Sequence, residues 1–188
     1  VSSTDGEVRL VIDPTVNIPT NLTGNPGTTV IAPINIDNAN GVESVDLVLS
    51  YDTTLLDVID DVGGGRPAVR LGSLSTGGTL FYNINDAAGT ITVTLAFTVA
   101  RGPGGGSLVT IDFQIKPAAA TGTTRIDLQS VSLTEGSQIV IPAPAVGADS
   151  TDGIITITAA NQAPTDIALS NSSVAENQPS GTVVGNLS

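Results

Sequence analysis

The sequence predicts an all-β fold, a jelly-roll β-sandwich of about nine short strands. Residues 89–99 (GTITVTLAFTV) place Ile91, Val93, Leu95 and Phe97 on one phase and mainly threonines on the other. Because successive side chains of a strand point to opposite faces, this alternation predicts a half-buried strand. The 21 glycines and 11 prolines divide the 188 residues into short segments, as turns do in all-β domains. Helical periodicity is not convincing in any segment.

The first part of the chain is expected to form strands at residues 7–12, 28–36, 44–51 and 55–59. Pro33 falls inside the second of these strands. We expect it at a sheet edge or a bulge, because proline cannot donate a hydrogen bond to a ladder. The third strand alternates clearly, and its core-facing residues are Val45, Leu47, Leu49 and Tyr51.

The rest of the sandwich is expected to form strands at residues 68–71, 79–84, 89–99, 108–116, 123–133, 139–141 and 153–158. The second and third of these form a hairpin around a turn at residues 85–89. The fourth directs Val109, Ile111, Phe113 and Ile115 inward. In the fifth, the apolar phase slips by one residue between Leu128 and Val131, which predicts a β-bulge.

Composition argues against several classes of function. The net charge is −12 and the six basic residues are scattered, so no basic stripe exists to bind nucleic acid or an anionic membrane. Without Cys or His, the usual structural zinc sites and the Ser–His–Asp and Cys–His nucleophiles are excluded. An apolar run long enough to span a membrane is absent. With no Trp, two Tyr and three Phe, carbohydrate binding is also disfavoured.

The composition is typical of a protein that works outside a microbial cell. Oxidisable Cys and Met are absent, and the strands are rich in Thr and Ser. We therefore expect a secreted or cell-surface protein from a bacterium or an archaeon. The chain begins at Val1 without a signal peptide, which leaves two explanations. Either an export signal has been removed, or the segment was cut at a domain boundary.

The segment GVESVDLVLSYDTTLLDVI at residues 41–59 resembles the cohesin family, whose members read G-[VI]-x-x-x-D-[FL]-x-[FL]-x-Y-D-x-x-x-L. Further pieces match in the family's order: LGSL (71–74), GTITVTLA (89–96), GGGSLVTIDFQIK (104–116), LQSVSLTEG (128–136) and DGIITI (152–157). The resemblance covers residues 8–158 and implies a cohesin-like domain over residues 1–160. It implies an extracellular, non-catalytic nine-stranded jelly roll that binds a partner protein.

The same resemblance implies where a partner binds. In cohesins that bind dockerins, the strand matching residues 44–50 carries polar recognition residues on its outward face. The family's aspartate falls on Asp46, whereas Ser44 replaces its usual asparagine and puts ordinary dockerin affinity in doubt. The expected binding residues are Ser44, Asp46, Val48, Tyr82, Asn83, Thr92, Thr94 and Glu135. The alternative is that Asp46 is only a solvated strand residue.

Residues 161–188 (NQAPTDIALSNSSVAENQPSGTVVGNLS) resemble the opening of a cadherin-type repeat, which reads N-x-A-P and then V-x-E-N-x-P-x-G-T. About a quarter of a repeat is present, which is too little to bury a core of its own. Three arrangements stay open. This tail is a truncated next domain, an extra strand on the sandwich, or a donor strand that joins a neighbouring subunit.

Calcium is the one metal that the sequence suggests, and no other cofactor is expected. The cadherin resemblance makes Glu176 a calcium ligand, although the NQAP linker lacks the aspartates of the usual site. Asp149 and Asp152 do not follow EF-hand spacing, and we expect them to form turns.

These patterns favour a non-catalytic module for protein–protein assembly, with a dockerin-like module as its partner. The alternative is structural: a repeat of an adhesin stalk, or a filament subunit that binds copies of itself by donating its tail strand. An enzyme is least favoured. Paired carboxylates could support glycoside hydrolysis, but the aromatic platforms that grip sugars are scarce.

Overall fold

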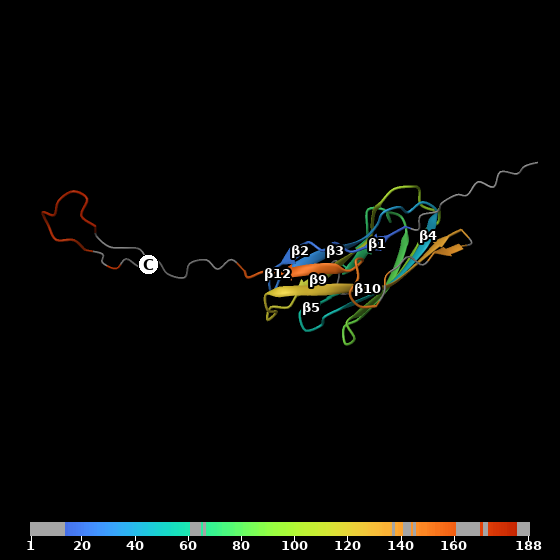
Figure 1. The fold of residues 1–188 in the computed structure, drawn as a ribbon, viewed down its shortest axis with the longest axis horizontal. Coiled ribbons are helices and arrows are strands. Elements are labelled where there is room, and N and C mark those ends of the chain that lie inside the picture. Colours follow the sequence, from blue (N-terminus) through green and yellow to red (C-terminus); the bar gives the residue numbers. More distant parts are fainter. Residues whose placement is uncertain are drawn as a thin grey trace, which may run out of the picture.

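The computed structural model is a sandwich of two β-sheets that face each other across one apolar core (Figure 1). It describes residues 14–60, 65, 67–136, 138–140, 144, 146–160, 170 and 173–183. Within these residues the chain forms twelve strands and no helix. The part of the chain so described therefore has no helix that could cross a membrane.

The smaller sheet is built around two long neighbouring strands, β3 (Thr29–Ile36) and β9 (Gly106–Ile115). Three short strands complete it: β1 (Val16–Asn17) pairs with β3, while β5 (Leu56–Asp57) and β6 (Val69–Leu71) pair with β9. All of these pairs are antiparallel.

The larger sheet has the strand order β2-β12-β10-β4-β8-β7. Its long central strands are β10 (Gly122–Glu135) and β4 (Val42–Tyr51), followed outward by β8 (Thr90–Ala96) and β7 (Thr79–Asn85). On the other side lie β12 (Gly153–Ile157) and β2 (Leu22–Gly24), which pair in parallel. The short strand β11 (Gln138–Val140) pairs with the end of β10.

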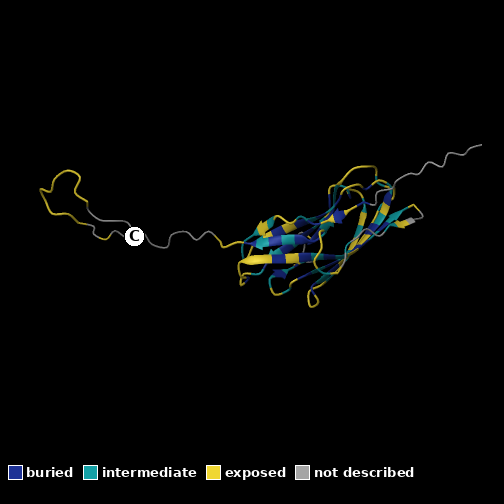
Figure 2. Cartoon of the chain, viewed as in Figure 1, coloured by how far each residue is buried: buried dark blue, intermediate teal, exposed yellow. Residues whose placement is uncertain are grey.

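The core follows from the alternation in the sequence, and Figure 2 shows the resulting buried and exposed bands along the strands. The predicted inward residues of β4, β8 and β9 are all buried except Phe97, which lies just after β8 and is half-buried against the core. Tyr51 and Phe113 join the two sheets edge to face, with ring centroids 5.5 Å apart. Each fully buried aliphatic or aromatic side chain contributes about 1.5–3 kcal/mol.

Most predicted strands are confirmed, and the differences have physical reasons. The strand expected at residues 7–12 lies outside the described residues. The strands β1 and β2 were not predicted, because two or three residues are too short to show alternation. Pro33 pairs with β9 on one side but lies beyond the two residues of β3 that pair with β1, which agrees with the expected edge position.

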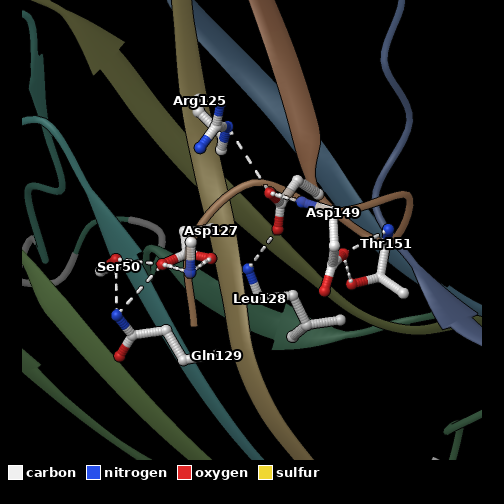
Figure 3. Close-up of polar contacts among 9 residues, drawn as sticks. Ser50, Arg125, Asp127, Leu128, Gln129, Asp149 and Thr151 are labelled. Carbon is white, nitrogen blue, oxygen red and sulfur yellow. Dashed lines mark hydrogen bonds and ion pairs between the residues drawn. The ribbon is translucent and has the colours of Figure 1, made fainter. Parts of the chain in front are cut away.

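The predicted bulge in β10 is confirmed, and a buried carboxylate supports it. The register with β4 shifts between Leu128 and Ser130, so Gln129 is the extra residue. Asp152 is 2% exposed and accepts a hydrogen bond from the Leu128 amide at 3.0 Å. Figure 3 labels Leu128, the donor of this bond, and shows it on β10 beside Gln129. Its second oxygen accepts from the Asp149 amide, and the Arg125 guanidinium lies 3.5 Å away. Asp152 thus links the bulge to the turn before β12.

The described tail residues, 170 and 173–183, are exposed and form turns but no strand. Thr182 closes one turn by donating its amide to the Pro179 carbonyl. Residues 161–169 lie outside the described part, so the three arrangements of the tail remain predictions.

Candidate functional site

The candidate site is the outer face of β10, β4, β8 and β7, which we call the sheet face. Inward residues of these strands fill the core, so every second side chain points away from it. The registers align the outward residues in four rows. The rows are Ser132–Asp46–Thr94–Phe81, Ser130–Val48–Thr92–Asn83, Thr134–Ser44–Ala96–Thr79 and Asp127–Ser50–Thr90–Asn85. Neighbouring side chains within a row are about 5 Å apart.

Asp46 and Asp127 are the charged residues in these rows, and Asp46 lies in the middle of the face. Its Oδ1 accepts a hydrogen bond from the Thr94 hydroxyl at 2.6 Å, which fixes the carboxylate toward β8. Most other positions carry hydroxyl or amide side chains, and the aliphatic ones are Val48 and Ala96. The face is therefore mainly a surface of hydrogen-bonding groups with two carboxylates, Asp46 at its centre and Asp127 in an outer row.

Phe81 adds an exposed aromatic ring to the same row, and sequence reasoning missed it. Its side chain is 64% exposed on β7, directly opposite Thr94. The sequence around it, Leu80-Phe81-Tyr82, is apolar on both phases, so alternation does not decide which side faces out. A signal existed in the flanking Thr79, Asn83 and Asn85, which share the phase of Phe81 and are polar.

The structure brings six of the predicted binding residues together on the sheet face: Ser44, Asp46, Val48, Asn83, Thr92 and Thr94. Tyr82 lies on the opposite phase, beside Val93, and its side chain packs against the core. Glu135 ends β10 after a second irregularity and pairs with Val42, so it lies at the margin of the face. Glu176 is an exposed residue of the tail.

The hydroxyl of Tyr82 reaches the edge of the sandwich and donates to Asp60, whose two oxygens lie 2.9 and 2.8 Å away. Burial and this hydrogen bond to a carboxylate raise the pKa of Tyr82 above its usual value of 10.0. Tyr82 is thus a neutral group at neutral pH, held by Asp60 and directed away from the sheet face.

Among the described residues, His, Cys, Asp and Glu form no group of three that could hold a metal ion. The sheet face offers hydroxyls, two amides, two carboxylates, two small aliphatic side chains and one aromatic ring. These groups suit contact with another protein surface, where polar side chains provide orientation and an aromatic residue provides an apolar anchor.

Comparisons with known proteins agree with this architecture. The family model described as "Cohesin domain" matches residues 14–138. The chain is 30% identical over 108 residues to cellulose-binding protein A of Clostridium cellulovorans. That match covers 55% of the chain but only 5% of the relative's length.

Two similar solved structures show the same fold. A type II cohesin domain from the cellulosome of Acetivibrio cellulolyticus has a TM-score of 0.57 at 14% identity, covering 77% of this chain and 95% of that chain. A type III cohesin module from the ScaE cell-surface anchoring scaffoldin of Ruminococcus flavefaciens has a TM-score of 0.54 at 15% identity, covering 78% and 88%. Since the family model spans most of the sandwich, the chain belongs to the cohesin family, whose domains are non-catalytic protein–protein interaction modules.

Proposed function

We propose that this domain captures a dockerin-like module through the sheet face. The observation that carries the proposal is the row Ser132–Asp46–Thr94–Phe81, which places a fixed carboxylate and an exposed aromatic ring on one flat surface. Cohesins that bind dockerins use the strand corresponding to β4. The partner would lay a helical surface across the face, with Asp46 accepting hydrogen bonds and Phe81 packing in an apolar contact.

Phe81 is proposed as the anchor because exposed aromatic residues contribute strongly when an interface buries them. The side chains around it are short, so a partner can approach the backbone of β8 closely. Ser44 and Asn83 would supply further hydrogen bonds from neighbouring rows. Tyr82 and Glu135 are then peripheral to the contact.

The test is calorimetric titration of the chain with a panel of dockerin modules. For a module that binds, Phe81→Ala should weaken affinity at least tenfold, the loss expected of a buried aromatic anchor. Asp46→Asn should weaken it less. Ile31→Ala is the matched control, because Ile31 is also exposed but lies on β3 of the other sheet. Unchanged affinity in both Phe81→Ala and Asp46→Asn would refute this surface.

For the tail, we propose the beginning of a second, cadherin-like unit, with Glu176 as one ligand of a calcium site that other residues would complete. The sequence resemblance supports this proposal. We also propose that the chain acts outside a bacterial cell, which family membership and its cysteine-free composition support.

A further inference from the structure

A groove runs along the edge of the sandwich and adjoins the sheet face at Asn83. One wall consists of Tyr82, Asn83 and Ile84 of β7 and of Asp86, which follows this strand. The other wall is the segment Asp57 to Asp60, which begins in β5. The hollow measures about 440 Å³ and is open to solvent. The Tyr82 hydroxyl crosses from one wall to Asp60 on the other and holds the two walls in place.

The β7 wall presents unpaired backbone groups. Within the described residues, β7 is the last strand of its sheet and pairs only with β8. The Phe97 amide donates to the Glu43 carbonyl, so the opposed residues Ser44 of β4 and Ala96 of β8 are a non-hydrogen-bonded pair. The backbone N–H and C=O groups of Ala96 therefore point to β7, where they pair with Thr79. Because this direction alternates along β7, the N–H and C=O groups of Leu80, Tyr82 and Ile84 point away from β8, to the open side.

This edge lacks the features that usually protect an exposed strand. The segment Thr79–Asn85 contains no charged residue and no proline, and it carries the exposed Phe81. Such an edge can add a further strand, in which main-chain hydrogen bonds provide affinity and neighbouring side chains provide specificity.

Charge identifies the kind of strand that fits. The described lining contains three carboxylates, Asp57, Asp60 and Asp86, and no Lys or Arg. The chain's own tail, residues 161–188, contains two acidic residues and no basic residue. A second copy carries a net charge of −12. Both are repelled by the groove, whereas a lysine- or arginine-bearing segment is attracted.

We propose that the β7 edge groove binds an extended, basic peptide segment of a partner protein by β-strand addition. The segment pairs with the outward backbone groups of Leu80, Tyr82 and Ile84. Its basic side chains approach Asp57 and Asp86, while Asp60 remains bonded to Tyr82.

The probe is a synthetic peptide of alternating lysine and valine, compared with its glutamate–valine counterpart. We expect the lysine peptide to bind more tightly at low salt and the glutamate peptide not to bind. On saturation, NMR amide exchange at Tyr82 and Ile84 should slow at least about tenfold, because newly bonded amides exchange only when the pair opens. Phe81 and Asn83, already paired with β8, should change little.

Two variants separate this groove from the sheet face. Asp57→Asn keeps an oxygen for the Val58 amide, and it leaves in place the hydrogen bonds that the hydroxyls of Tyr82 and Tyr51 donate to Asp60 and Asp86. It should weaken lysine-peptide binding about two- to fivefold. Asp46→Asn should leave that binding unchanged. Equal binding of both peptides, or binding without slower exchange at Tyr82 and Ile84, would overturn the proposal and leave the sheet face untouched.

Discussion

Replacing Asp152 by alanine should destabilise the domain strongly, although this aspartate is not one of the sheet-face residues. The Leu128 amide at the bulge is bonded to Asp152 in a buried position, and its isolation costs about 1–3 kcal/mol. Loss of the charge-assisted bond from the Asp149 amide adds about 1.5–3 kcal/mol. The Arg125 side chain is 44% exposed, so its ion pair adds at most about 1 kcal/mol. Together these terms amount to about 2.5–7 kcal/mol.

Urea unfolding followed by far-UV circular dichroism measures this loss, provided that the slope with denaturant stays constant. Asp152→Asn should cost less, about 1–2 kcal/mol, because its amide oxygen still accepts from Leu128 while its NH₂ group faces another donor. The exposed Asp46→Ala is the control and should stay within about 0.5 kcal/mol of wild type. A stability for Asp152→Ala within about 1 kcal/mol of wild type would refute the role of the buried carboxylate.

Two further predictions concern acid stability and assembly. Burial alone would raise the pKa of Asp37, but hydrogen bonds from Thr15 lower it below 3.8, and bonds from Thr54 lower that of Asp52. The stabilisation from these carboxylates is complete above their pKa in the unfolded state and is lost as pH falls through their pKa in the folded state. Asp37→Asn should therefore make the free energy of unfolding less dependent on pH at acid pH. Wild-type and variant curves that run parallel would contradict this. In sedimentation and negative-stain microscopy, we expect monomers both with and without residues 161–188. Filaments that disappear when these residues are removed would instead establish a filament subunit joined by its tail strand.

The larger strands could be predicted because each carries its own alternation. Even the bulge in β10 was visible, since Leu128 and Val131 cannot both reach the core in a regular strand. Burial of Asp152 was not visible: its pattern indicates only a turn, and the amide that it satisfies lies 24 residues earlier, at Leu128. Long-range polar partners of this kind leave no local signal in the sequence.

The candidate site divides in the same way. Alternation along β4 and β8, with the family resemblance, was enough to place Asp46, Thr92 and Thr94 on one face. To place Phe81 on this face, the register of β7 against β8 was needed, and this register depends on packing between the strands and not on either strand alone. The edge groove required still more, because its walls come from β7 and from a segment that follows a strand of the other sheet.

The two proposed surfaces meet at β7 but use different directions of the same strand. Side chains stand perpendicular to a sheet, whereas backbone hydrogen bonds lie in its plane. Phe81 therefore contributes its ring to the sheet face, while Tyr82 and Ile84 present backbone groups to the groove. An added strand would extend the sheet face beyond β7 without covering Asp46, which lies two strands away on β4. The two proposed contacts, a helical partner on the face and a basic extended segment at the edge, are therefore geometrically compatible on one domain.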